Sequence, residues 1–259
     1  MKEIPEEKSL ICYYSIIGHF RNFYTNTRNT HTLDTQKNIL KEILRKPWLP
    51  YAAPFVLFLL LTEPARYFPS LVPHFYIAKT LLVASVLWFW RHHYAEDFSL
   101  GLSIREIVVA TCCGLLVLLI WIVPEGIFYQ FAPGDGFNPY TMTESRPGAI
   151  ALIAVRLAGA ALVVPIMEEL FWRSFMMRYL INVDFRSVTM GSFSWLSFLG
   201  VAILFGLEHH RIVVGIIAGL LYGLLLLWQK NLRGVTLAHA VTNLGLGVYV
   251  LVTGNWVFW

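Results

Sequence analysis

The stretch Pro165-Ile166-Met167-Glu168-Glu169-Leu170-Phe171-Trp172-Arg173 places two adjacent carboxylates and a guanidinium inside the longest apolar run of the chain. Ionisable side chains are costly at membrane depth, so a functional site is the first hypothesis for them. Residues four apart share a helix face, which predicts an ion pair between Glu169 and Arg173, in the favourable order of acid before base. Glu168 then points in another direction and is free to meet residues from other helices.

The composition of the 259 residues is typical of a membrane protein. Hydrophobic residues make up 57% and charged residues only 14%, with a mean hydropathy of +0.59, which excludes an ordinary soluble domain and a disordered chain. Long apolar runs with few charges occupy residues 48–65, 71–90, 106–130, 148–181, 195–209, 212–229 and 234–252. We therefore expect an all-α fold, a polytopic transmembrane helical bundle of about seven to eight spans.

The run 148–181 is too long for one perpendicular crossing of the bilayer. A helix of this length measures about 50 Å against a hydrocarbon core of ~30 Å, so the run must tilt, protrude or break. Pro165 marks the expected kink.

The basic residues indicate the orientation of the chain. A formal net charge of +4 would indicate nucleic acid in a soluble protein, but here the charges lie in short loops and act as topology signals, so we expect no nucleic-acid partner. With the N-terminus in the cytoplasm, the outer loops keep only Arg66, Arg146 and Arg211. The cytoplasmic side then receives Lys37, Lys41, Arg45, Lys46, Arg91, Arg105, Arg173, Arg178, Arg186, Lys230 and Arg233.

Two further spans carry unusual polar residues. Phe205 and His209 lie four apart at the end of the fifth span, and His239 and Asn243 lie four apart in the seventh, so each pair shares one helix face. Counted at ~1.5 Å per residue from the cytoplasmic side, these side chains reach a level similar to that of Glu168. The estimate requires that residues 182–194 lie along the interface instead of extending the fifth helix.

A buried carboxylate, imidazoles and a carboxamide are suited to hydrolysis. A carboxylate in an apolar pocket can act as a general base towards water, and an imidazole with a carboxamide can donate hydrogen bonds to an oxyanion. These parts predict an amide hydrolase without a serine or cysteine nucleophile. The alternative is a zinc site, although no HExxH pair is present.

Three motifs resemble those of the type II CAAX prenyl endopeptidases, also called the CPBP or Abi family of intramembrane proteases. They are EExxxR at Glu168, Glu169 and Arg173, FxxxH at Phe205 and His209, and HxxxN at His239 and Asn243. The resemblance covers about residues 148–252. The layout of the whole chain also resembles a bacterial CAAX prenyl protease-related subgroup associated with exosortase systems.

The resemblance implies roles for the motif residues. Glu168 would activate water with His209 beside it, His239 and Asn243 would bind the oxyanion, and Glu169 with Arg173 would form a supporting ion pair. No cofactor is expected by this mechanism. In the competing metalloprotease description, zinc would be bound through Glu168, His209 and His239.

The resemblance also implies a substrate and an organisation. The substrate would be a membrane-associated, lipid-modified protein or peptide, and the chain would be an integral protein of the bacterial inner membrane. The chain would comprise a cytoplasmic and interfacial segment (1–47), N-terminal transmembrane helices (48–147), the catalytic helical core (148–252) and a C-terminal tail (253–259). Within the first segment, residues 37–46 predict a short basic interfacial helix.

Structural roles compete with these assignments. Glu168 could serve only a buried ion pair, His209 could be an interfacial helix-end residue, and His239 with Asn243 could join helices by hydrogen bonds. A non-catalytic immunity or scaffold protein of the same fold is therefore the alternative function, and a transporter is a third. Arg156, Lys79, Glu63 and Glu125 are interpreted as snorkelling or helix-end residues, and Gly215, Gly219 and Gly223 as a helix-packing stripe.

Overall fold

A computed structural model describes residues 41–63, 67–128 and 136–259 and shows no strand among them. The chain separates into two compact units, Met1–Leu49 and Pro50–Trp259. In the first unit, residues 41–44 are helical. The remainder of the interfacial helix predicted over 37–46 lies mostly outside the described residues.

Each predicted apolar run contains a helix, which confirms the all-α membrane-protein fold. Five helices among the described residues are long and apolar enough to cross a bilayer: α5 (Val72–Phe89), α6 (Ile104–Ile122), the continuous run Arg146–Tyr179, α12 (Ile212–Gln229) and α13 (Leu232–Thr253). Two apolar helices are shorter, α3 (Leu49–Thr62) and α11 (Trp195–Leu207). At 14 and 13 residues they measure only about 20 Å each, so the number of complete crossings stays a prediction.

The helix ends follow local sequence chemistry. Ser103 and Glu106 form a reciprocal capping box at the start of α6, and Ser194 caps α11 through a hydrogen bond from the backbone N–H of Ser197. Asn231 caps α13 in the same way. Because Ser194 stops α11 from extending backwards, residues 182–194 form turns and the short 3₁₀ segment Phe185–Ser187, as predicted.

The long central helix continues past Pro165 without interruption. It runs through α8 (Arg146–Ala158), a π-helical segment (Gly159–Val163), α9 (Val164–Glu169), a second π-helical segment (Leu170–Met176) and α10 (Met177–Tyr179). The turns before Pro165, where we expected a kink, are widened to π-helical geometry and accommodate the missing N–H. The run therefore stays one helix, and it must tilt or protrude if it is to fit a bilayer.

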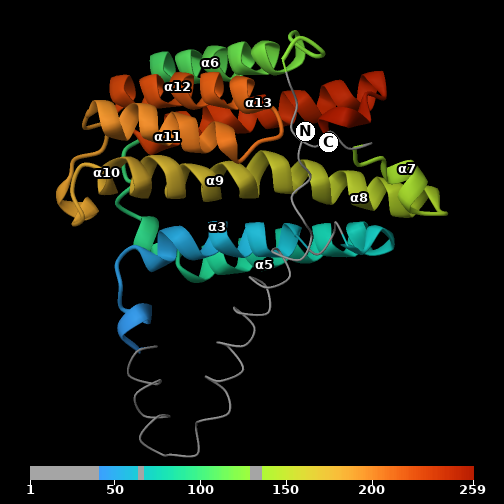
Figure 1. Cartoon of the computed structure of the whole chain (residues 1–259), viewed down its shortest axis with the longest axis horizontal. Helices are drawn as coiled ribbons and strands as arrows, with labels where there is room; N and C mark the ends of the chain where they lie inside the picture. The colour runs from blue at the N-terminus through green and yellow to red at the C-terminus, as the bar shows by residue number, and fades with distance from the viewer. Residues whose placement is uncertain (1–40, 64–66, 129–135) are drawn as a thin grey trace, which may run out of the picture. The chain divides into compact units, whose positions relative to one another are not determined.

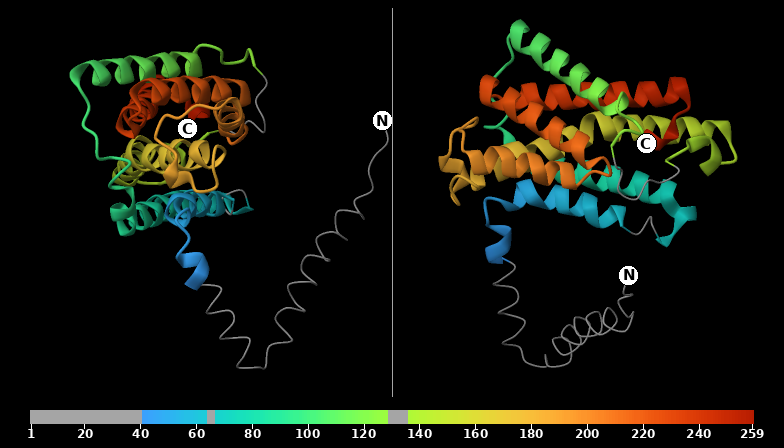
Figure 2. Two further views of the ribbon diagram at one scale, coloured as in Figure 1. Left: turned by 90° about the vertical axis from the view of Figure 1, so that its left-hand side faces the viewer. Right: turned by 45° about the horizontal axis from the view of Figure 1, so that its top comes forward.

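The helices of this unit form three layers (Figure 1). The long helix α8–α9–α10 lies in the middle, with α6, α11, α12 and α13 on one side and α3 and α5 on the other, and the views of Figure 2 show the same order. Helix α13 packs on both α6 and α9. On the opposite side Phe55 of α3 stacks on Phe171 at 4.1 Å between ring centroids.

Helices α11 and α12 form an antiparallel hairpin in close contact. A Cβ atom on Gly219 would lie 3.0 Å from the Cα of Ala202, and one on Gly223 would lie 2.8 Å from the Phe198 ring. The glycine stripe is therefore a packing surface, as predicted. The turn of this hairpin carries His209, so the close contact of α11 and α12 sets its position.

Candidate active site

The predicted ion pair between Glu169 and Arg173 is present and completely buried. The Nε–Oε2 distance is 3.2 Å and both side chains are 0% exposed, while Arg173 Nη1 donates a hydrogen bond of 3.3 Å to Oε1. The guanidinium lies over the Phe205 ring, 4.3 Å from its centroid. Because no water solvates these side chains, each charge of the buried pair is compensated by the other.

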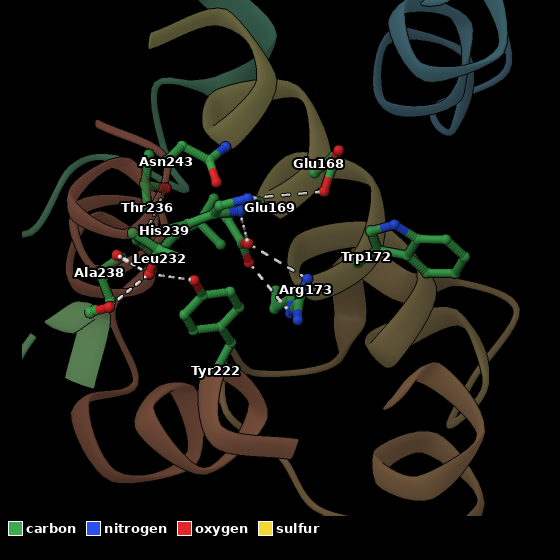
Figure 3. A network of polar contacts seen from close by, with 12 residues as sticks. Glu168, Glu169, Trp172, Arg173, Tyr222, Leu232, Thr236, Ala238, His239 and Asn243 are labelled. Carbon is green, nitrogen blue, oxygen red and sulfur yellow. Dashed lines mark hydrogen bonds and ion pairs between the residues drawn. The ribbon is translucent and has the colours of Figure 1, made fainter. Parts of the chain in front are cut away.

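Glu169 also holds the imidazole of His239. The Nδ1–Oε1 distance is 2.8 Å, and the ring stacks on Tyr222 with centroids 5.1 Å apart and planes inclined by 25°. Arg173, Glu169 and His239 thus form one chain of polar contacts (Figure 3). Because the carboxylate accepts from Nδ1–H, the orientation of the ring and its tautomer are both defined.

Glu168 forms no hydrogen bond within the chain Arg173–Glu169–His239, as expected for its different direction on the helix. Its Oε2 lies 3.9 Å from His239 Nε2, too far for a direct hydrogen bond. The oxygen is buried and has no hydrogen-bond partner among the described residues. Buried polar atoms are almost always hydrogen-bonded, so this oxygen is available for a ligand such as water.

His209 is held by its own helix. Its Nδ1 lies 2.7 Å from the carbonyl oxygen of Phe205, and its ring packs against those of Phe205 and Trp121. Since a carbonyl oxygen only accepts, Nδ1 carries the hydrogen and Nε2 of the neutral ring is a lone pair. The ring is half-buried, so the interfacial helix-end interpretation stays an alternative to the catalytic one.

Asn243 is positioned through Pro165. Val164 N–H donates to Gly159 O in the π-helical pattern, and the next donor in that pattern would be residue 165, which as proline has no N–H. The Ala160 carbonyl is left free, and Asn243 Nδ2 donates to it at 2.8 Å. One of the two amide hydrogens of Asn243 is thereby committed, and the other remains for the cavity.

A cavity of about 260 Å³ connects these side chains. Glu168, His209, His239 and Asn243 line it together, although they come from α9, the turn after α11, and α13. Glu169 and Arg173 do not line the cavity and lie behind His239. The structure therefore brings four of the six predicted site residues to one space and leaves two as their support.

The match to a known protein family lies in the part of the chain that contains the candidate site residues. Residues 150–245 match the family model of the type II CAAX prenyl endopeptidases described as Rce1-like. Over these residues the chain is similar to the Rce1-like family. No curated protein and no solved structure matches the chain. The Rce1-like segment contains all six predicted site residues, whereas membership in the exosortase-associated subgroup stays a prediction.

Several residues at the candidate site were missed or misinterpreted from sequence. Tyr222 lines the cavity, stacks on His239 and donates to Thr242 Oγ1 at 2.7 Å. Glu208 precedes His209 outside the cavity lining and accepts from the Trp172 indole at 2.9 Å. Lys79 and Arg156, interpreted as snorkelling residues, line the cavity instead. Their charge within apolar runs was the signal, but the direction of their side chains depends on packing between distant helices.

The metal alternative has little geometric support. Among residues 41–63, 67–128 and 136–259, no group of three histidine, cysteine, aspartate or glutamate side chains is placed to hold a metal ion. Glu168, His209 and His239 share the cavity without forming such a group. The residues present do not fit zinc in this arrangement, and we derive no step that requires it.

Proposed function

We propose that this integral membrane protein is an intramembrane endopeptidase in which Glu168 activates water. The observation that carries the proposal is the buried, unpartnered Oε2 of Glu168, a residue that lines the cavity together with His209, His239 and Asn243. A buried carboxylate oxygen without a hydrogen-bond partner can accept a proton from water as a general base. The family match independently supports a CAAX-protease type of protein.

The proposed reaction begins with water bound between Glu168 and His239. A water molecule can form hydrogen bonds with both Oε2 and Nε2 across the 3.9 Å that separates them. Glu168 takes a proton from this water, and the oxygen attacks the peptide carbonyl carbon to form a tetrahedral oxyanion. The proton then passes from Glu168 to the departing amine as the C–N bond breaks, which restores the carboxylate.

The oxyanion requires hydrogen-bond donors on its other side. The second amide hydrogen of Asn243 is one, since the first is held by Ala160 O. His239 donates from Nε2 only as an imidazolium, because Nδ1–H already faces Glu169.

The proposed substrate is a membrane-associated, lipid-modified protein or peptide, and the proposed location is the bacterial inner membrane with the N-terminus in the cytoplasm. The cavity walls support an apolar substrate, since aromatic and aliphatic side chains surround the polar groups. A pocket of this kind binds apolar groups and uses a few polar contacts for orientation.

Replacing Glu168 by glutamine tests the proposal. Glu168→Gln keeps the size of the side chain and removes the base, so we expect at least a hundredfold loss of processing with unchanged abundance in the membrane. The measurement compares the mature termini of membrane and exported proteins in cells with the wild-type chain, the variant or neither. Glu144→Gln, at an exposed position, is the matched control.

Two other outcomes would change the conclusion. Normal biological function of Glu168→Gln without any change in protein termini would favour the non-catalytic immunity or scaffold role. Loss of hydrolysis after exhaustive chelation, with recovery on addition of zinc, would replace water activation by Glu168 with the metal mechanism.

A further inference from the structure

Residues 254–259 fold back over the cavity of the candidate active site, and we call them the strap. Helix α13 is followed by Gly254, whose left-handed φ of +69° reverses the chain. The short 3₁₀ segment Trp256–Phe258 comes next. Phe258 and Trp259 then line the same cavity as the proposed catalytic groups. The cavity is therefore closed in part by a segment that carries none of those groups.

The strap lies against the segment before α7 (Pro139–Met142). The Phe137 N–H donates to the Trp259 carbonyl oxygen at 2.9 Å. Gly136 has a φ of +76°, and a Cβ atom there would lie 1.8 Å from the Trp256 carbonyl oxygen. A side chain at position 136 would thus displace the strap, in addition to straining its own backbone. The sequence of this segment therefore fits the strap in the closed position.

Cations from two other elements hold the rings of the strap. The guanidinium carbon of Arg211 lies 4.6 Å from the Phe258 centroid, and that of Arg156 lies 5.3 Å from the Trp259 centroid. Arg211 belongs to the turn between α11 and α12, which also carries His209. The strap therefore connects α8, this turn and the segment before α7 across the cavity.

The strap has few buried contacts that would prevent it from opening. Within the described part of the chain, its single backbone hydrogen bond to a segment other than α13 comes from Phe137. No residue of Trp256–Phe258 is buried, and the hydrogen bond from Asn255 to Glu125 is exposed. Segments with these features open locally at low cost. A Cβ atom on Gly254 would have no neighbour within 4 Å, so this residue has room to rotate as a hinge.

A peptide has little room beside the closed strap. With Phe258 and Trp259 in place the cavity measures about 260 Å³, whereas ligand pockets commonly measure ~300–1,000 Å³. Trp259 also borders an adjoining cavity of about 290 Å³. Withdrawal of its ring would widen the passage between the two cavities, which together reach the usual range. A peptide extends to both sides of its scissile bond, so it requires this larger space.

We propose that the strap is an autoinhibitory lid. Phe258 and Trp259 occupy space that the peptide substrate needs, and the strap swings away about Gly254 before the peptide reaches Glu168. The inference rests on the proposed peptidase function and adds a form of regulation to it. The apparent affinity for substrate is reduced by the fraction of molecules in which the strap is closed.

Opening of the strap can be measured without a substrate. Ala218 lines the cavity and is 1% exposed, so Ala218→Cys reacts with N-ethylmaleimide only when the cavity opens. Ala110 of α6 is 0% exposed and does not line the cavity, so Ala110→Cys reports general loosening of the fold. The full chain, with its native cysteines replaced by serine, is labelled in phosphatidylcholine nanodiscs, and intact mass gives both rates.

We expect Gly136→Ala and Trp259→Ala each to label the cavity cysteine about tenfold faster or more, because they disturb the two sides of one contact. The rate for the cysteine in α6 should stay unchanged. Gly126→Ala is the matched control, since Gly126 has a similar φ of +78° but no neighbour within 4 Å of an added Cβ. Val257→Ala, at an exposed position of the strap, is the second control, and neither should change the labelling.

The same variants test inhibition in cells. Processing, measured from mature protein termini, should rise about threefold or more in Gly136→Ala and Trp259→Ala, because a larger fraction of the molecules is open. It should stay unchanged in Gly126→Ala.

Three results would overturn the proposal: unchanged labelling of the cavity cysteine, equally faster labelling of both cysteines, or processing that falls while labelling of the cavity rises. The last would mean that the strap helps to hold the substrate. If Glu168→Gln leaves every protein terminus unchanged, the peptidase function and this inference fail together. Failure of this inference alone shows in the labelling rates or in the direction of the change in processing, while processing still depends on Glu168.

Discussion

At the scale of single residues, the charges around Glu169 depend on one another. Arg173 and Glu169 are both 0% exposed, so Glu169→Gln leaves an unpaired buried guanidinium and should destabilise the protein by about 3–5 kcal/mol. The double variant Glu169→Gln/Arg173→Met should recover at least half of that loss, because it removes both charges. It should still process substrate poorly, since His239 then loses the charge-assisted hydrogen bond from Nδ1–H to the Glu169 carboxylate that orients its ring. Thermal unfolding in detergent, followed by tryptophan fluorescence, measures the stabilities.

The exposed Arg105→Met serves as the control and should leave the unfolding temperature unchanged. Additive effects of the two single substitutions would contradict the buried pair. Helix periodicity was sufficient to predict this pair, because residues four apart meet on any helical turn. The contact of Glu169 with His239 was not predictable, since it joins residues 70 positions apart and depends on how α13 packs on α9.

At the scale of elements, two helix-interior prolines each leave a carbonyl that a distant side chain satisfies. Pro54 in α3 leaves the Pro50 carbonyl, which accepts from Tyr94 Oη at 2.6 Å, and Pro165 leaves that of Ala160 to Asn243. Pro165→Ala restores a backbone donor and favours an ordinary α-helical turn, which should release Asn243 and shift the residues before Glu168. We expect stability to be unchanged or higher and the cleavage rate to fall about tenfold, as for loss of one oxyanion donor.

Rates for Pro165→Ala, Asn243→Ala and the double variant, measured on one identified substrate, check this coupling. The double variant should be no slower than Asn243→Ala alone, and Pro54→Ala should retain the wild-type rate. If the two substitutions instead lower the cleavage rate independently in the double variant, Pro165 does not act through Asn243. The sequence predicted a disturbance at Pro165 but not its form, because a π-helical turn depends on which carbonyl finds a partner outside the helix.

At the scale of the whole molecule, exposed basic residues of two separate loops lie together in the Pro50–Trp259 unit. Arg173 and Arg178 are buried in ion pairs and no longer count as topology signals. Arg233 Nε donates to Phe98 O at 2.7 Å, which brings the loop before α6 and the turn before α13 together. The exposed cations at these loops are Arg91, Arg105, Lys230 and Arg233.

The positive-inside rule then predicts that the loop containing Glu96 is cytoplasmic and that Glu144 faces the outside. Both positions are exposed and accept single cysteines once Cys12, Cys112 and Cys113 are replaced by serine. A membrane-impermeant maleimide should label position 144 in intact cells and position 96 only after permeabilisation, as measured by a mass shift on gels. Among the described helices that are long and apolar enough to cross a bilayer, α6 lies between the two positions, so the labelling pattern reports whether it crosses. Labelling of both positions from outside would mean an even number of crossings between residues 96 and 144, and the reverse pattern would place the loop containing Glu144 on the cytoplasmic side.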